Sequence, residues 1–260
     1  NASNATADNT VAIGIQANAT GSGNVVIGAN AGKKHSTTAQ GNNTVLIGVE
    51  AGSQAANNEG QVSVGWQAGQ GTLKAFNTAI GYQAGQFING ENNVAFGRGA
   101  GSGTSTDARL AINNTVAIGT GAKATADNGV ALGSNSVANV AAGQTGADPL
   151  SAKDATAPAG VWKATHAAVS VGNGTTLTRQ ITSVAAGTAD TDAVNVAQLK
   201  AAGFKLAASA STGGELGGTV ADDKIQNGET VTVDAGKNIK VTHTANKVSI
   251  ATKDEVEFTK

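Results

Sequence analysis

The stretch that decides the fold is Val11-Ala12-Ile13-Gly14, because the chain repeats this four-residue phrase with only small changes. Self-similarity at a short period is the sequence signature of a solenoid, in which each repeat forms one turn of a coil. Eight copies occur, and their closing glycines are 14, 20, 17, 16, 16, 22 and 14 residues apart. The other copies are residues 25–28, 45–48, 62–65, 78–81, 94–97, 116–119 and 130–133.

Each phrase predicts a strand of about four residues, in which the first and third side chains share one face. The other face carries mostly Ala, with one Val, one Leu and one Ser. A strand with two apolar faces is buried on both. One face can fill the interior of the coil, and the other then needs a partner, for which a neighbouring subunit is the simplest choice. The pattern does not decide which face points inward.

Aspartate in place of Ile80 or Ile118 is expected to destroy the roll, since an unpaired buried charge is very costly.

Between the strands lie turns rich in Asn and Gly, such as residues 21–24 and 41–43, and both residue types tolerate the left-handed backbone of sharp corners. Eight turns stacked at about 4.8 Å predict a rod of about 40 Å.

The composition excludes several function classes. The chain has 36 Gly, 3% aromatic residues, no Cys and no Met, yet 40% of its residues are apolar, which suits a narrow coil better than a globular core. A formal charge of −1 without a basic stripe argues against nucleic-acid binding. No run approaches the ~20 apolar residues of a membrane span. The polar start without a signal sequence suggests a fragment of a longer protein.

The organisation along the chain predicts three parts. Residues 1–178 form the roll, interrupted by a long insertion at about 139–167 that contains Trp162 and precedes a ninth phrase at 169–172. Residues 179–203 contain a short helix with Asp190 or Thr191 as its N-cap and Gly203 as its stop. Residues 204–260 predict an antiparallel meander with strands at 229–234, 238–243 and 247–252.

The repeated Asn-x-Val-Ala-Ile-Gly phrases, followed by Thr-Asp-Ala-Val-Asn-Val-Ala-Gln-Leu at 191–199, closely resemble the trimeric autotransporter adhesins of the YadA-like family. The resemblance implies a mainly β, left-handed parallel β-roll head, a neck at 179–203, a small β module similar to a Trp ring at 204–260, and an intertwined homotrimer. It also implies display on the surface of a Gram-negative bacterium, with an outer-membrane anchor C-terminal to this segment. The residues expected to hold the neck together as a trimer are Val194, Val196 and Leu199.

The family implies adhesion to extracellular matrix proteins, host or bacterial cells, or abiotic surfaces. Candidate contacts are large or charged side chains expected on the turns, and Trp66 and Tyr82 stand out because both follow a repeat glycine. An alternative is that these aromatic residues only cover the roll, and that Trp162 only packs the insertion back onto it. The full set is Lys33, Lys34, His35, Trp66, Phe76, Tyr82, Phe87, Arg98 and Trp162.

The sequence predicts no catalytic, cofactor or metal site. The three His lie in separate segments, there is no Cys, and the paired acids Asp190/Asp192 and Asp222/Asp223 are better explained by caps and turns. The glycine-rich run 97–103 has no following apolar helix and is interpreted as a repeat corner instead of a phosphate loop. Two functions therefore compete: an adhesive head, or a passive spacer within a longer fibre.

Overall fold

The computed structural model describes residues 2–33, 41–147, 161–207, 209, 212, 223–226, 229–245 and 247–258. The chain divides into two compact units, Asn1–Ile181 and Thr182–Lys260. The first unit contains the repeats, and the second contains the one helix of the described residues and four antiparallel strands. Each unit is considered by itself.

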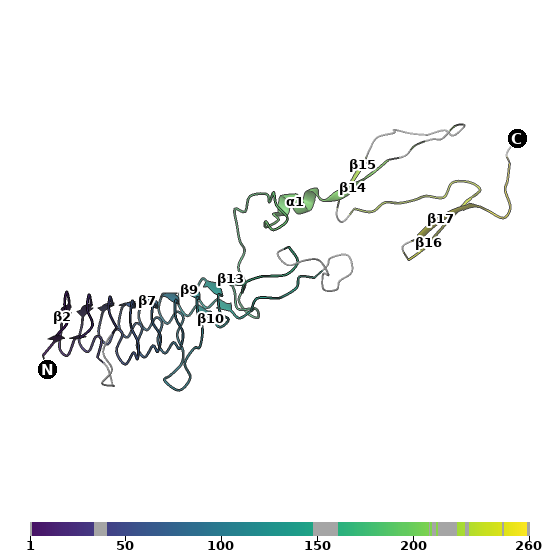
Figure 1. The fold of residues 1–260 in the computed structure, drawn as a ribbon. Coiled ribbons are helices and arrows are strands. Elements are labelled where there is room, and N and C mark those ends of the chain that lie inside the picture. Colours follow the sequence, from purple (N-terminus) through teal and green to yellow (C-terminus); the bar gives the residue numbers. More distant parts are fainter. Residues whose placement is uncertain are drawn as a thin grey trace. The chain divides into compact units, whose positions relative to one another are not determined.

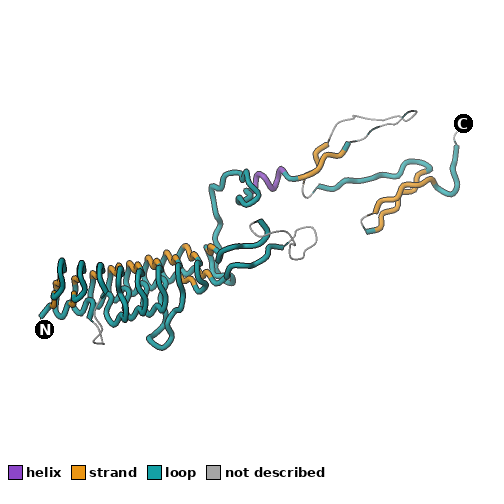
Figure 2. The backbone as a smooth tube through the Cα atoms, viewed as in Figure 1, coloured by secondary structure: helices purple, strands orange, loops and turns teal. Residues whose placement is uncertain are grey.

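The first unit is a coil whose strands stack in parallel along one side, as the repeats predicted (Figures 1 and 2). Nine strands form this sheet, in the order β13-β11-β9-β8-β7-β6-β5-β4-β2. The second side carries the short parallel pairs β1 (Asn4–Ala5) with β3 (Asn18–Ala19) and β10 (Lys123–Ala124) with β12 (Val137–Ala138). The strands of the main sheet are β2 (Val11–Ile13), β4 (Val25–Ile27), β5 (Val45–Ile47), β6 (Val62–Val64), β7 (Thr78–Ile80), β8 (Val94–Phe96), β9 (Val116–Ile118), β11 (Val130–Leu132) and β13 (Val169–Ser170).

The register places equivalent residues of successive phrases beside one another, so that Val45 pairs with Val62 and Ile47 with Val64. The middle residue of nearly every phrase points into the coil and is buried, whereas the residues on either side of it point outward. The inward column comprises Ala12, which is partly buried, and the buried Val26, Leu46, Ser63, Ala79, Ala95, Ala117 and Ala131. The small face therefore fills the coil, and the bulky face covers its outside.

This arrangement corrects the expectation for Ile80 and Ile118. Both side chains lie on the outer face of the coil, where Ile80 is half-buried and Ile118 is 38% exposed. An aspartate at either position would meet solvent in a single chain, and it would therefore not break the coil from within. Small residues dominate the interior, in which Val26 and Leu46 are the larger members of the inward column. A second buried column consists of alanines: Ala17, Ala31, Ala51, Ala68, Ala84, Ala100 and Ala122.

The repeat glycine is required where each strand turns the corner. Gly28 has φ +136°, and a Cβ built there would lie 2.3 Å from the carbonyl oxygen of Gly48 in the next turn. The same close approach joins Gly48 to Gly65 at 2.4 Å. Any side chain at these positions would push neighbouring turns apart, because backbone atoms cannot yield as a flexible side chain can.

Buried asparagines just before the strands tie successive turns together. The side chain of Asn93 donates to the Ile112 carbonyl at 2.9 Å, and its Oδ1 accepts from the Thr115 amide at 3.0 Å. Asn77 does the same one turn earlier, donating to the Gly90 carbonyl at 2.9 Å and accepting from the Asn93 amide at 3.1 Å. A buried polar side chain is tolerated when both its donor and its acceptor are used, and here each asparagine also fixes the spacing of two turns.

In the second unit, helix α1 (Val196–Ala201) begins later than the sequence suggested. Its N-cap is Asn195, which accepts from the Gln198 amide, and the Gln198 side chain accepts from the Asn195 amide, so the two residues form a capping box. Asp190 and Thr191 are therefore not the cap. Gly203 does not end the helix as a left-handed residue but opens strand β14.

Strand β14 (Gly203–Leu206) pairs antiparallel with β15 (Asp223–Gln226), and β16 (Ile239–Thr244) pairs antiparallel with β17 (Lys247–Thr252). Two of the three strands predicted for this part thus form a hairpin. Residues 229–234 lie outside any strand, which corrects the predicted meander. Their alternating valines, Val231 and Val233, are partly exposed, so this stretch has the pattern of a strand without a neighbour to pair with in the described residues.

The inward column predicts a sharp contrast between two aspartate substitutions. Ala117→Asp would bury a charge in the coil and should lower the free energy of unfolding by more than about 4 kcal/mol. Thr120→Asp, on the exposed corner of the same turn, should change it by less than about 0.5 kcal/mol. Thermal unfolding followed by circular dichroism checks both; equal loss in the two variants would contradict the assignment of the inward face.

Asp192 predicts a pH response of the turn before the helix. Its Oδ2 accepts from the Ala189 amide at 3.0 Å and the Thr188 amide at 2.9 Å, and these bonds lower the pKa of the carboxyl group. A lowered pKa in the folded state stabilises the turn above the unfolded pKa of about 4, and this stabilisation is lost as pH falls through the folded pKa. The Thr188 and Ala189 amide resonances should therefore shift below about pH 4, and Asp192→Asn should abolish the shift while Asp190→Asn preserves it.

Candidate binding surfaces

The outer face of the main sheet is an apolar surface on the single chain. Its side chains are the first and third residues of the phrases, and many are substantially exposed, including Ile13 at 57% and Phe96 at 53%. Other exposed members are Val11, Ile47, Val94, Ile118, Leu132 and Val169. Monomeric proteins seldom expose a contiguous apolar patch of more than a few hundred Å², and larger patches mark interaction sites. This face, called here the outer sheet face, is therefore a packing surface.

The corner that follows each repeat glycine carries the predicted contacts Trp66 and Tyr82. The two rings lie in successive turns and stack on each other, with centroids 4.7 Å apart and planes inclined by 23°. Trp66 is 38% exposed and Tyr82 47% exposed, so the stack keeps a free outer edge. The same corner carries the exposed Ile15 and Val49 in earlier turns and Arg98 in the next turn.

Phe76 and Phe87 cover glycines of the preceding turn. A Cβ at Gly60 would lie 2.5 Å from the Phe76 ring, and a Cβ at Gly71 would lie 2.8 Å from the Phe87 ring. Phe76 remains 54% exposed, whereas Phe87 is half-buried. Each ring thus covers the roll on one side and keeps some exposed surface on the other.

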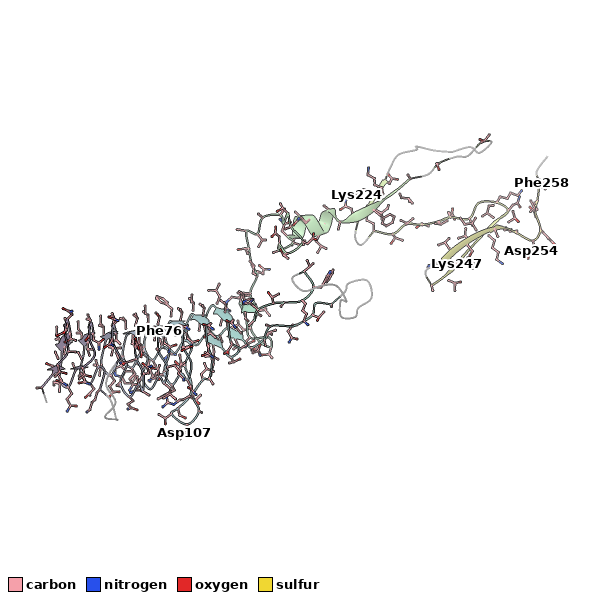
Figure 3. All side chains as sticks on the ribbon, in the orientation of Figure 1. Phe76, Asp107, Lys224, Lys247, Asp254 and Phe258 are labelled. Carbon is pink, nitrogen blue, oxygen red and sulfur yellow. The ribbon has the colours of Figure 1, made fainter. Side chains whose placement is uncertain are left out.

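A loop at about residues 102–110, between β8 and β9, projects from the roll, with Asp107 in its exposed outer part (Figure 3). Arg109 anchors it, since its Nη1 donates to the Gly71 carbonyl beside the Phe87 ring. The Thr104 amide closes the loop by donating to the Ala108 carbonyl at 3.2 Å. This surface was not predicted, although the sequence carries a signal for it: the 22-residue interval between Gly97 and Gly119 is the longest of the series.

The remaining predicted contacts are scattered. Lys33 is exposed, and its ammonium group donates to Gln16 Oε1 at 2.5 Å. Lys34 and His35 lie outside the described residues. Trp162 is half-buried, and its carbonyl accepts from the Gly146 amide at 2.7 Å, which ties the two ends of the insertion together. Of the predicted contacts, the structure stacks Trp66 on Tyr82 and places Arg98 at the same corner of the next turn.

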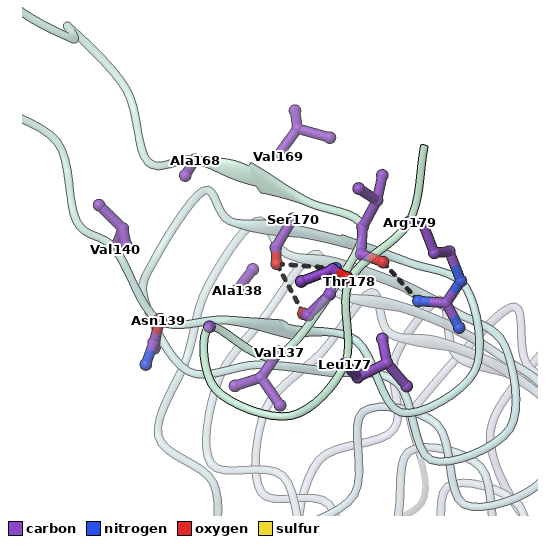
Figure 4. Close-up of a pocket in the computed structure, with 13 residues that line it drawn as sticks. Val137, Ala138, Asn139, Val140, Ala168, Val169, Ser170, Leu177, Thr178 and Arg179 are labelled. Atoms are coloured by element: carbon purple, nitrogen blue, oxygen red, sulfur yellow. Dashed lines mark hydrogen bonds between the residues drawn. The ribbon is translucent and has the colours of Figure 1, made fainter. Parts of the chain in front are cut away.

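The last turn of the roll borders an open, mostly apolar pocket of about 390 Å³, lined among others by Val137, Val169, Leu177 and Arg179 (Figure 4). Arg179 closes one side of it. Its guanidinium donates to the Ser134 carbonyl at 2.7 Å and to Ser136 Oγ at 2.9 Å, and also to the Val171 carbonyl. The first residue of the predicted neck thus fastens the chain to the end of the coil.

In the second unit, the three neck residues predicted at a trimer interface are all exposed on the single chain: Val194 at 69%, Val196 at 66% and Leu199 at 55%. Among the described residues, no three His, Cys, Asp or Glu side chains lie close enough to hold a metal ion. Across the same ranges, no helix has the length and hydropathy needed to span a membrane.

Comparison with known proteins agrees with this architecture. The YadA head domain repeat matches residues 5–31 and 113–136, and the coiled stalk of trimeric autotransporter adhesin matches residues 180–222. The autotransporter adhesin BadA of Bartonella henselae is 60% identical over 73 residues, which cover 28% of this chain and 2% of BadA. The chain thus contains segments similar to the head repeats and the coiled stalk of trimeric autotransporter adhesins, and it spans a small fraction of the length of this relative. This similarity argues against an enzymatic function.

Proposed function

We propose that this chain forms the head, neck and following β module of a homotrimeric adhesin, with residues 1–178, 179–203 and 204–260 in these three roles. The observation that carries the proposal is the outer sheet face, which is apolar along the whole roll and uncovered in the single chain. Three copies that turn this face toward a common axis would bury it, and closed cyclic symmetry limits the assembly to a defined size. The exposed apolar neck residues fit the same three-fold arrangement.

Adhesion is proposed to use the surfaces that such packing leaves free. Outside the outer sheet face and the corner of Trp66 and Tyr82 lie the projecting loop with Asp107, the adjacent Phe87 and Arg109, and the exposed Lys33. Each would be present three times, and multivalency can raise avidity by roughly 10²–10⁴ over a single contact. The family and the BadA relative support export and attachment to the surface of a Gram-negative cell, with the membrane anchor outside this segment.

The trimer makes a first prediction. Ile80→Asp would place three carboxylates in the buried interface, and Leu199→Asp would do so in the neck, so each should raise the protein concentration needed for half-assembly by at least about 100-fold. Light scattering across a dilution series measures this, with Thr106→Asp on the exposed projecting loop as the control in the head. Unchanged assembly in both interface variants would remove these residues from the subunit contacts.

Adhesion makes a second prediction, tested on the trimer with immobilised collagen, fibronectin, laminin, plastic and glass. Replacing Thr106 and Asp107 by alanine should weaken binding to the recognised surface about tenfold. A loss of about 0.5 kcal/mol at each of three copies gives about 1.5 kcal/mol in total, which is roughly tenfold. Thr120→Ala is the matched control, because it also lies on an exposed corner.

The pattern over the panel discriminates between functions. Saturable binding to one protein supports a ligand-specific head, and equal binding to every surface supports a non-specific adhesin. Binding to none, by a confirmed trimer, would contradict an adhesive role for this segment and favour a spacer that only extends the fibre.

A further inference from the structure

The main sheet has two margins, and each carries aromatic residues in the same part of the roll. At one margin, the residue after the repeat glycine is Trp66 in the turn of β6 and Tyr82 in the turn of β7. At the other margin, two residues before the first position of the phrase, stands Phe76 in the turn of β7. Aromatic residues are exceptions at these two positions of the repeat. In the other turns, the residues equivalent to Phe76 are all Asn or Gly: Asn9, Gly23, Asn43, Gly60, Asn92, Asn114 and Asn128.

The aromatic residues of both margins occupy the same height along the coil. The pairing of Val62 with Thr78 and of Val64 with Ile80 places β6 and β7 side by side in register. The Phe76 ring leans over Gly60 and so spans both turns, and the Trp66–Tyr82 stack spans the same two turns at the opposite margin.

Within one chain these two groups cannot meet. Phe76 and Tyr82 are six residues apart across an extended strand, which corresponds to about 20 Å. All three rings remain substantially exposed, at 54% for Phe76, 38% for Trp66 and 47% for Tyr82. Phe76 also has φ +58°, a conformation that bulky residues rarely adopt and that persists where the surroundings compensate for it.

We infer that the two margins meet between subunits, so that Phe76 of one copy packs against the Trp66–Tyr82 stack of a second copy. This inference rests on the homotrimer proposed above. In a cyclic trimer the contact between neighbours is heterologous: one margin of each copy meets the opposite margin of the next. Copies related by rotation about an axis along the coil keep identical residues at identical heights, so the two aromatic groups face each other at all three seams.

The chemistry of the rings suits such a contact. Trp66 and Tyr82 cover each other's faces, so the stack presents ring edges outward, and the face of Phe76 can receive them in an edge-to-face arrangement. The stack is already ordered within one chain, which reduces the side-chain entropy lost on assembly. Three such contacts, called here the aromatic seams, would fix the register in which the subunits associate, because the matching residues occur in only two turns.

Cysteine cross-linking tests the seam, because the natural chain has no Cys. The double variant Phe76→Cys/Tyr82→Cys should form covalent trimers on a non-reducing gel under mild oxidation, and reduction should release single chains. A disulfide requires Cα atoms about 4.4–6.8 Å apart, so the two cysteines of one chain cannot join to each other. The control Phe76→Cys/Thr120→Cys displaces the second site by two turns, about 10 Å along the coil, and should give little covalent trimer.

A mutant cycle provides an independent readout. Phe76→Ala and Tyr82→Ala should each raise the protein concentration at which half of the trimer dissociates. Because both remove the same contact, the double variant should raise this concentration several-fold less than the product of the two single effects. The pair Phe76→Ala and Thr120→Ala should be additive. A confirmed trimer that lacks both the cross-link and the coupling would overturn the aromatic seam alone, whereas a monomer by light scattering would overturn the proposed trimer and the seam together.

Discussion

The distance between successive turns is the constraint on which the rest of this structure depends. At each corner the backbone of one turn passes so close to the next that only glycine fits, as the 2.3 Å approach between a Cβ at Gly28 and the Gly48 carbonyl shows. The same spacing brings the buried asparagines within hydrogen-bonding distance of the following turn. The interior between these corners is narrow and is filled mainly by columns of alanines. One backbone distance thus selects the glycine and the asparagine of the repeat.

A coil filled by alanine buries little apolar area in each turn, and the burial of apolar area is the main favourable term in folding. The larger apolar side chains of the repeat, including Ile13, Phe96 and Leu132, lie outside and remain exposed on the single chain. Backbone hydrogen bonds and asparagine ladders hold the turns together, but most of the hydrophobic surface is available only for association. Stability and assembly are therefore coupled in the first unit, as in oligomers whose protomers are not expected to be stable alone.

The sequence predicted the parallel solenoid because the repeated phrase specifies strand and corner together. It could not tell which strand face points inward, because Ala and Val are both apolar and only the width of the coil discriminates between them. The predicted caps Asp190 and Thr191 were wrong because Asn195 forms a capping box with Gln198 further along the chain. The shared position of Trp66 and Tyr82 after a repeat glycine was visible in the sequence, whereas their stacking and the hydrogen bond from Arg109 to Gly71 each join different turns and had no local signal.

The repeat also determines where variation can carry function. Positions inside the coil, at the repeat glycine and in the asparagine ladders are fixed by contacts with both neighbouring turns, so a change there disturbs the stack. Fewer contacts constrain the residue after each repeat glycine and the intervals between phrases. These positions hold the features that break the repeat: the Trp66–Tyr82 stack, Phe76, and the projecting loop anchored by Arg109. Irregularities in such a chain therefore mark its specific contacts, because regular positions are already used for holding the coil together.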